Sequence, residues 1–326
     1  MKLLFICSTQ FDYLQDLTYC GLVELLGNQN VCDYPWNPKY HLPIKNYPKN
    51  LGYTGFSLPK FTIKNFQGYD AVIIGSAKKE ALLKYEYLIP KIQSLPVIFI
   101  DGGDREEIGG DFYRLGLGKE FESVFKKRYP DLIFKREYLP SLHGHLPHVF
   151  PFPFSFPFTL SQKPVQEKKY QVSFWAQQKP LIREQAIKLL KGKYDCDQNG
   201  TTLNQGFKTY KRKGLFYLEE ISRCKIVLNF RGGGWDTMRY WETPAMETFM
   251  ISQKPEILIP NNFEENKHVA WVSENLSNLI DKIDYYLLND DERNRMATNA
   301  REHLLKYHLN THRAQFLLSK IKTIIP

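Results

Sequence analysis

Residues 226–252 read IVLNFRGGGWDTMRYWETPAMETFMIS, and this stretch decides the fold. Four of its first five residues are apolar, and the run predicts a buried strand. An arginine and three glycines follow, and after them an aspartate and a threonine that can cap a helix over residues 238–246. A second apolar run, 248–252, predicts another strand. Strand, loop, helix and strand in this order are typical of a parallel sheet in an α/β protein.

The loop between the first strand and the helix has the composition of an anion site. Glycine lets the backbone approach a phosphate closely, and the start of a helix presents free N–H groups with a partial positive charge. Guanidinium groups add full charges in a fork that matches phosphate oxygens. The residues that we expect to bind the anion are Arg231, Gly232, Gly233, Gly234 and Arg239.

Glu242 lies three residues after Arg239, so the two side chains share one face of the predicted helix. A carboxylate there is suited to accept hydrogen bonds from the hydroxyls of a ribose. The same residues also fit a surface loop followed by an ordinary ion pair within one helix. The residues alone leave both interpretations open.

The first half of the chain repeats the alternation of strands and helices. With 326 residues the chain exceeds the usual size of a single core, so we expect two domains. The turn after the first strand lacks the glycine fingerprint of dinucleotide-binding domains, which argues against an ordinary dinucleotide site there. The strands predicted in this half are residues 2–8, 31–36, 71–75, 97–101 and 134–139.

Acidic side chains follow the strand at residues 97–101. That strand ends at Asp101, and Gly-Gly-Asp104-Arg105 comes directly after it. In open α/β sheets, ligands bind beyond the carboxyl ends of parallel strands. Asp104 is therefore our candidate for a general base, with Asp12 and Asp16 as replacements. Asp101 either contributes to the same site or caps the turn.

A change of texture separates the two halves. Residues 140–164 are dense in proline and phenylalanine, and proline stops both helices and strands. We therefore expect an N-terminal domain over residues 1–150, a linker over 151–168 and a C-terminal domain over 169–308. Three histidines in the stretch lack the spacing of zinc ligands, so we expect no metal.

A second anion site is predicted near the start of the C-terminal domain. Residues 170–176 alternate as in a strand, and residues 181–190 are predicted to be helical. Proline is well placed at the first turn of that helix, because its missing N–H is not needed there. Lys179 and Arg183 flank this helix start. The alternative is a solvated basic helix end.

Residues 170–326 resemble a known family. The motif Arg239-Tyr-Trp-Glu242, then Ala245-Met246 and Phe249-Met250-Ile251-Ser252, is similar to the donor-site segment of GT-B glycosyltransferases. The resemblance is strongest to the glycosyl-transferase family 1 C-terminal domain of CgeB-like spore-maturation proteins. It implies two Rossmann-like, doubly wound domains facing a cleft. It also implies that a helix over residues 309–326 crosses back to the N-terminal domain.

The same resemblance implies an enzyme that moves a sugar from a nucleotide-diphosphate donor to an acceptor hydroxyl. The anion-site residues, Lys179 and Arg183 would bind the diphosphate, Glu242 the ribose, and the segment at Glu264 the nucleotide or sugar. Catalysis would be electrostatic, with no cofactor and no metal, while a base from the first domain deprotonates the acceptor. The acceptor stays open between a glycan, a lipid, a protein and a small molecule.

One residue departs from the family pattern. Glu247 stands where the family usually has glycine, in the turn after the predicted helix. A carboxylate near a diphosphate would repel it, so Glu247 must point away, or the donor differs, or the site is altered. The alternative function is therefore a non-catalytic binding or scaffold protein of the same fold.

Charge and cysteine content bound the remaining possibilities. The net charge of +9 favours polyanions, and a polyanion-binding protein is the third alternative. The charge forms no long basic run, so we expect no nucleic acid, whereas peripheral contact with an anionic membrane stays open. Five cysteines without metal-type spacing indicate a reducing cytoplasm.

Overall fold

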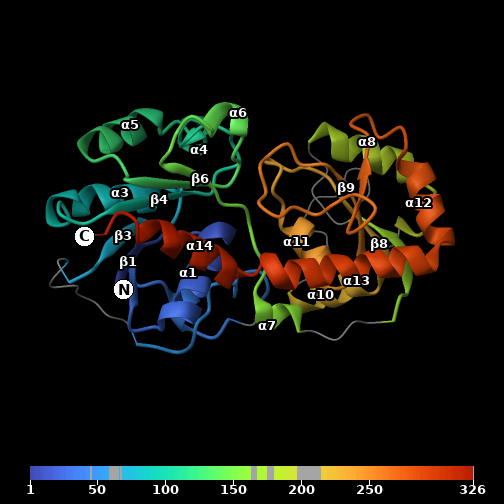
Figure 1. Cartoon of the computed structure of the whole chain (residues 1–326), viewed down its shortest axis with the longest axis horizontal. Helices are drawn as coiled ribbons and strands as arrows, with labels where there is room; N and C mark the ends of the chain where they lie inside the picture. Colours follow the sequence, from blue (N-terminus) through green and yellow to red (C-terminus); the bar gives the residue numbers. More distant parts are fainter. Residues whose placement is uncertain are drawn as a thin grey trace. The chain divides into compact units, whose positions relative to one another are not determined.

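The computed structural model of the chain describes residues 1–44, 46–58, 66, 68–162, 167–174, 180–196 and 214–325. The chain divides into two compact units, each with its own parallel sheet (Figure 1). Unit 1 comprises Met1–Pro157, Ile257–Ile259 and Asn310–Pro326, and unit 2 comprises Phe158–Glu256 and Pro260–Leu309.

The sheet of unit 1 has the strand order β2-β1-β3-β4-β5-β6, and all its neighbouring strands are parallel. Its strands are β1 (Leu3–Ile6), β2 (Val31–Tyr34), β3 (Ala71–Ile74), β4 (Val97–Asp101), β5 (Leu132–Lys135) and β6 (Val149–Pro151). Its helices are α1 (Tyr13–Leu26), α2 (Pro38–His41), α3 (Lys79–Leu88), the short 3-10 helix η1 (Ile89–Lys91), α4 (Gly110–Arg114), α5 (Gly118–Lys127), α6 (Pro140–His143) and α14 (Asn310–Ile321).

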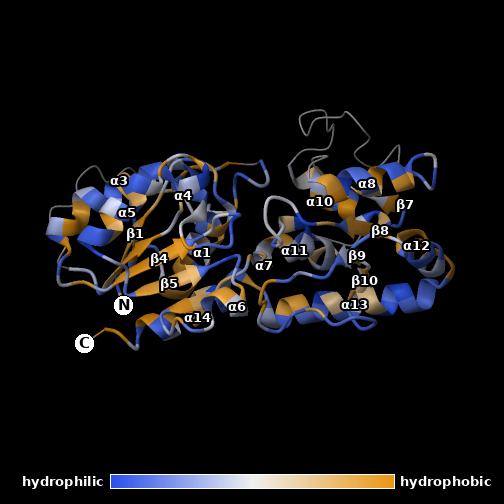
Figure 2. Ribbon diagram, turned by 90° about the horizontal axis from the view of Figure 1, so that it is seen from above, coloured by the Kyte–Doolittle hydropathy of each residue, from blue (hydrophilic) through white to orange (hydrophobic). Residues whose placement is uncertain are grey.

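Helices cover both faces of this sheet because alternate strand residues point to opposite sides. Leu4 and Ile6 of β1 join the buried cluster that contains the inner faces of α3 and α5. Phe5 points the other way and packs edge-on against Tyr19 of α1, with ring centroids 5.5 Å apart. The strands β1, β4 and β5 are accordingly hydrophobic along their length (Figure 2). This is the doubly wound α/β arrangement.

The last helix of the chain, α14, packs along α1 within unit 1. A Cβ atom at Gly21 would lie 2.5 Å from the backbone oxygen of Asn310, so only glycine permits this approach. The Asn310 side chain donates to Glu24 at 3.1 Å, and Nε of Arg313 donates to the Pro153 carbonyl at 3.1 Å. The first turn of helix α14 is therefore fixed by contacts with α1 and with the Pro153 backbone.

The proline-rich stretch contains more regular structure than its sequence indicates. The predicted strand at 134–139 is found as β5, which begins two residues earlier and ends four residues earlier, and β6 follows inside the proline-rich stretch. Proline is tolerated in β6 because β6 is an edge strand and Pro151 ends it. Beyond it, Phe152, Phe154 and Phe156 are buried in unit 1 rather than forming part of a linker.

Unit 2 contains a four-stranded parallel sheet with the order β10-β9-β8-β7. Its strands are β7 (Tyr170–Ser173), β8 (Cys224–Asn229), β9 (Phe249–Gln253) and β10 (Ala270–Val272). Its described helices are α7 (Phe158–Ser161), α8 (Leu181–Leu190), α10 (Leu215–Ser222), α11 (Met238–Ala245), α12 (Leu279–Leu288) and α13 (Asp290–Tyr307). No described helix of the chain is both long and apolar enough to span a bilayer.

A buried ion pair joins β4 to β5 in unit 1. Nζ of Lys135 lies 3.0 Å from Oδ2 of Asp101, and both side chains are fully buried. The same ammonium donates to the carbonyls of Arg105 at 2.6 Å and Glu107 at 3.0 Å. Asp101 in turn accepts from the backbone N–H of Gly109 at 2.7 Å. The pair therefore fixes the loop that follows β4.

A half-buried lysine joins two helix ends in unit 2. Nζ of Lys168 donates to the carbonyl of Ser222, where α10 ends, at 2.9 Å. It also donates to the Glu247 carbonyl just beyond α11 and to Oγ1 of Thr248, both at 3.1 Å. Helix C-termini favour a cation there. Burial nevertheless lowers the pKa of Lys168 from 10.5 to about 8.

Replacing Lys135 by methionine is expected to lower the free energy of unfolding by about 3 to 5 kcal/mol, because it leaves the Asp101 charge buried without its cation. Urea unfolding measures the loss. The matched control is Lys127→Ala, which removes an exposed ion pair with Glu86 and is expected to cost less than about 1 kcal/mol. Equal effects of the two substitutions would contradict the structural role of the buried pair.

The lowered pKa of Lys168 predicts that the free energy of unfolding rises with pH. Since the folded pKa is near 8 and the unfolded value is 10.5, the unfolded chain binds more protons between these pH values. The cost of burying the charge is fully present below pH 8 and disappears as pH rises toward 10.5. The difference in unfolding free energy between wild type and Lys168→Met should therefore move in favour of wild type by about 2 kcal/mol from pH 7 to pH 9.5. A pH-independent difference would contradict this.

Candidate functional site

The predicted glycine loop begins at the carboxyl end of β8 and is closed by backbone hydrogen bonds. The N–H of Arg231 donates to Oε1 of Gln253, at the end of β9, at 3.0 Å. The N–H of Gly232 donates to the carbonyl of Gly234 at 2.9 Å. The exposed tip is Gly233. The loop is thus a tight turn anchored to the neighbouring strand.

Glycine at position 232 lets a neighbouring arginine approach the loop closely. A Cβ atom there would lie 3.1 Å from Nη2 of Arg183. This guanidinium comes from the first turn of α8 and donates to the Phe230 carbonyl at 3.0 Å, and its side chain is 8% exposed. The two predicted anion sites, one at each helix start, therefore meet at the same place in unit 2.

Arg239 extends this cluster from the first turn of α11. Its guanidinium carbon lies 5.5 Å from the ring centroid of Phe174, which directly follows β7. Phe174 packs edge-on against Phe230, with centroids 5.1 Å apart. Arg183 and Arg239 thus lie against adjacent aromatic residues, beyond the carboxyl ends of β7 and β8. Both guanidiniums are buried, and Coulomb attraction to an anion is stronger in such a partly desolvated place than in water.

Arg231 has a different environment from the other two arginines. Its guanidinium carbon lies 4.5 Å from the ring centroid of the buried Trp235, which is a cation–π contact. The side chain of Arg231 is partly exposed. Because its side chain is not buried, the Arg231 guanidinium can turn toward a ligand at lower cost than the two buried guanidiniums.

Glu242 lies one turn beyond Arg239 on α11 and is buried. The hydroxyl of Tyr217 on α10 donates to its Oε2 at 3.1 Å. Helix α11 itself is held through Asn229, at the end of β8, whose side chain accepts from Thr237 Oγ1 at 2.7 Å and donates to Ser252 Oγ at 3.0 Å. These contacts fix the position of both motif residues.

Two predicted donor residues have other placements. Lys179 lies outside the described residues. Glu264 is exposed, and Nζ of Lys267 lies 2.9 Å from its Oε1, which holds the pKa of this carboxyl below its usual range. The segment that carries Glu264 is nevertheless tied to α11, because the Tyr240 hydroxyl donates to Oδ1 of Asn262 at 2.5 Å.

Glu247 points away from the glycine loop. It follows the C-terminal end of α11, whereas the loop precedes the N-terminal end. Its carboxylate accepts from Thr298 Oγ1 at 3.0 Å and lies 3.7 Å from Nε of Arg301, both on α13. Its backbone has φ +49°, the left-handed conformation that favours glycine. The glycine of the family pattern is thus explained by the left-handed backbone conformation of this turn.

Two of the three predicted bases lie beside each other in unit 1. Asp12 caps α1, its Oδ1 accepting from the N–H of Gln15 at 3.2 Å, and its Oδ2 accepts from Ser76 at 2.6 Å. A Cβ atom at Gly102 would lie 3.7 Å from Asp12 Oδ1, which places Asp12 against the loop of Asp104. Asp104 is partly exposed and forms an ion pair with Arg136.

Asp16 has an environment unsuited to contact with an acceptor. Its side chain is fully buried and accepts from Tyr40 at 3.1 Å and from Gln15 at 3.1 Å, with Lys39 at 3.4 Å. Burial raises its pKa to about 6. Asp16, one turn after the capping Asp12, thus points into the interior of unit 1.

Sequence reasoning missed four residues that contact the predicted donor residues or their loop: Phe174, Tyr217, Trp235 and Gln253. Trp235 alone carried a signal, since an aromatic ring within a glycine-rich loop beside an arginine indicates a cation–π contact. The others come from β7, α10 and β9, and their approach depends on the tertiary fold.

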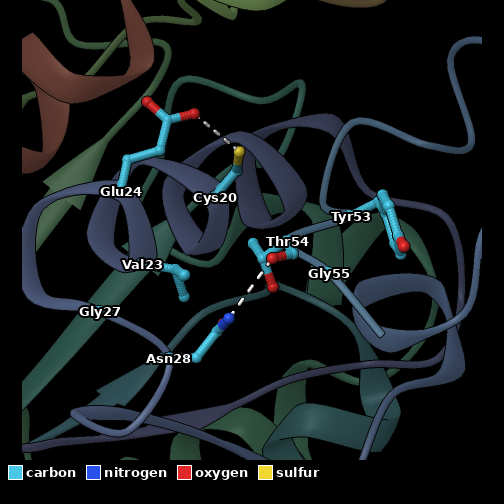
Figure 3. A pocket seen from close by; sticks show the side chains of 8 residues that line it. All are labelled: Cys20, Val23, Glu24, Gly27, Asn28, Tyr53, Thr54 and Gly55. Carbon is cyan, nitrogen blue, oxygen red and sulfur yellow. Dashed lines mark hydrogen bonds between the residues drawn. The ribbon is translucent and has the colours of Figure 1, made fainter. Parts of the chain in front are cut away.

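A hollow of about 480 Å³ lies elsewhere on unit 1, between the second half of α1 and residues 53–55 (Figure 3). Cys20 donates to Glu24 at 3.2 Å on one side, and Asn28 donates to the Thr54 carbonyl at 3.4 Å on the other. None of the predicted site residues lines it. It is therefore separate from the groups described above.

Comparisons with known proteins bear on this arrangement. Residues 191–319 match the family model described as glycosyl transferase-like. A search of curated protein sequences found no match.

Several solved structures have a similar fold at low sequence identity. HepE of Anabaena, in complex with UDP and glucose, is 11% identical, with a TM-score of 0.62 over 99% of this chain and 100% of its own. A glycosyltransferase of Rickettsia africae is 10% identical, with a TM-score of 0.56 over 99% and 98%. An α1,3-fucosyltransferase with GDP is 12% identical, with a TM-score of 0.54 over 99% and 90%.

The fold class predicted from the sequence is confirmed by these likenesses. The narrower resemblance to CgeB-like proteins stays a prediction. With two parallel-sheet α/β units, this chain has the GT-B fold, and residues 191–319 match the family model described as glycosyl transferase-like.

Proposed function

We propose that the protein is a glycosyltransferase that uses a nucleotide-diphosphate sugar. The observation that carries this proposal is the meeting of Arg183, Gly232 and Arg239 beyond the carboxyl ends of β7 and β8. Ligands of open α/β sheets bind at such ends. Two buried guanidiniums beside a tight glycine turn suit a diphosphate, which accepts bidentate hydrogen bonds.

The donor would occupy unit 2 through groups of distinct roles. Arg183, Arg239 and the N–H groups at Gly233 would bind the diphosphate, and Arg231 would leave Trp235 to add a third charge. Glu242 would accept hydrogen bonds from the ribose. Lys179 and Glu264 keep their predicted roles, near the diphosphate and near the nucleotide or sugar. Similar folds contain UDP, UDP-glucose or GDP, which supports a nucleotide donor.

The chemistry would be electrostatic. As the bond between the sugar and the diphosphate breaks, negative charge grows on the leaving diphosphate, and fixed guanidiniums stabilise it. A carboxylate of unit 1 would accept the proton of the attacking hydroxyl. Asp104 remains our candidate, with Asp12 beside it as the alternative, because both lie beyond strand ends with part of the side chain accessible. No cofactor or metal is assigned a role.

The alternative is a non-catalytic binding or scaffold protein of this fold, for which Glu247 was the main reason. The contacts of Glu247 with α13 remove that reason, because its carboxylate does not face the glycine loop. Polyanion binding is a weaker alternative. A cytoplasmic location, peripheral contact with an anionic membrane and the absence of nucleic acid stay predictions.

Replacing Arg239 by alanine is expected to weaken nucleotide binding by at least about tenfold, since a charge-assisted contact is worth about 1.5 to 3 kcal/mol. Isothermal titration calorimetry with UDP and with GDP measures this. The matched control is Arg295→Ala, which removes an exposed arginine of α13 and should leave the affinity unchanged.

Three outcomes are informative. Binding of one nucleotide that is lost only in Arg239→Ala supports the proposal. Equal losses in both variants indicate general attraction to the positive charge, which salt would weaken in parallel. If neither nucleotide binds the wild type, the donor site does not exist.

Glu247 gives a second prediction. Glycine at this position relieves the left-handed backbone strain, worth about 1 kcal/mol, and loses contacts of similar size, so Glu247→Gly should change the melting temperature little. Alanine loses the same contacts without the relief and should be less stable than glycine by about 1 kcal/mol. Nucleotide affinity should be unchanged in both variants. Tighter binding by Glu247→Gly would show that the carboxylate does act on the donor.

A further inference from the structure

A continuous row of aromatic side chains lies beyond the carboxyl ends of the strands of unit 1. Phe11, in the loop after β1, packs edge-on against Tyr13 with ring centroids 4.5 Å apart. Tyr13 packs in the same way against Phe154 at 5.8 Å. Phe154 is buried, Tyr13 is partly buried and Phe11 is 37% exposed. The row therefore emerges from the interior and presents one ring to solvent.

Arg136 and the two candidate bases, Asp104 and Asp12, lie next to this row of aromatic side chains. The guanidinium carbon of Arg136 lies 4.8 Å from the Phe154 centroid, and Arg136 forms the ion pair with Asp104. The loop of Asp104 returns through Gly102 to Asp12, the residue between Phe11 and Tyr13. The exposed aromatic ring and both carboxylates thus belong to one small surface, which we call the aromatic–acidic surface.

A lysine borders this surface on the side of Phe11. Nζ of Lys39 lies 5.9 Å from the Phe11 centroid and donates to the carbonyl of Gln10 at 2.9 Å. It also lies 3.4 Å from Oδ2 of the buried Asp16. Both contacts hold the ammonium beside the ring, so the one exposed apolar group here is bounded by charged groups on both sides.

We propose that the acceptor is a carbohydrate, bound with one sugar ring stacked on Phe11 and its hydroxyls directed to Asp12 and Asp104. This inference rests on the proposed function and names its acceptor class. A pyranose has an apolar face of C–H groups, polarised positively, which the negative face of an aromatic ring attracts. Its edge carries hydroxyls that donate to carboxylates and accept from an ammonium.

The other acceptor classes fit this surface less well. An acyl chain needs a continuous apolar surface, whereas Phe11 is a single ring between Lys39 and the carboxylates. An extended peptide is bound mainly through its backbone by a free sheet edge. The edge strands of this sheet are β2 and β6, not β1 or β4, which precede the loops of the aromatic–acidic surface.

Direct binding without donor tests the inference. Saturation-transfer NMR would use the methyl glycosides of glucose, galactose, mannose and N-acetylglucosamine, with octanol and a serine-rich peptide as the other classes. At least one glycoside should receive saturation at its ring C–H protons. Phe11→Ala should weaken that binding about tenfold, the effect of losing about 1.4 kcal/mol.

Two further variants separate stacking from folding. Phe11→Trp keeps a flat ring and should retain glycoside binding. Phe56→Ala removes an aromatic ring of unit 1 that is 68% exposed and does not belong to the aromatic–acidic surface, and it should also retain binding. Asp12→Asn and Asp104→Asn should change which ring protons of the glycoside receive most saturation. An amide accepts hydrogen bonds through one oxygen only, so the hydroxyls would be held differently.

Calorimetry with UDP and GDP on the same variants distinguishes this inference from the proposed function. Phe11→Ala should bind the nucleotide as wild type does. Glycoside binding that depends on Phe11, without any nucleotide binding, would keep the inference of a carbohydrate site and reject the transferase. The inference is overturned if no glycoside binds, if binding is the same in Phe11→Ala, or if octanol or the peptide binds in a Phe11-dependent manner instead.

Discussion

The buried ion pair of Asp101 and Lys135 is the interaction on which the functional edge of unit 1 depends. Its two charges lie opposite each other at the carboxyl ends of the adjacent strands β4 and β5. The ammonium uses its remaining donors on the carbonyls of Arg105 and Glu107, so the loop after β4 is folded around it. Asp104 lies inside that loop. A pair that contributes little net stability thereby fixes the position of an accessible carboxylate.

In unit 2, neutral side chains hold the loops that follow the strand ends. Asn229 at the end of β8 binds Ser252 and Thr237, and Gln253 at the end of β9 binds the Arg231 backbone. The acidic residues nearby are each engaged by a neutral donor, Asp236 by the Trp241 indole and Glu242 by the Tyr217 hydroxyl. One arginine also takes part, because Arg183 donates to the carbonyl of Phe230 directly after β8. Beyond its strand ends, unit 1 thus presents partly accessible carboxylates, whereas unit 2 presents guanidinium groups.

Sequence periodicity predicted the helices and strands that have a clear apolar pattern. The bounds of β4 and α8 agree with the pattern, and α1 ends at Gly27, whose φ is +82°. Helix α5 was missed although Phe121, Val124 and Phe125 have helical spacing, and β6 was missed because proline argues against a strand. Of the candidate site, the residues on one helix or one loop were predictable. The closeness of Arg183 to Gly232, and the burial of Asp16, arise from tertiary packing that no local pattern records.

The departure at Glu247 shows why a motif needs a physical account of each position. If the turn is interpreted as part of a donor site, its glycine makes room for a phosphate and a carboxylate there abolishes binding. The backbone gives another reason, because the residue has φ +49° and glycine adopts this conformation without strain. Here the strain is offset by contacts with Thr298 and Arg301, so a residue other than glycine is tolerated. A motif position that serves the backbone can therefore vary wherever a neighbouring helix supplies a compensating contact, whereas a side chain at Gly232 would have to displace the Arg183 guanidinium.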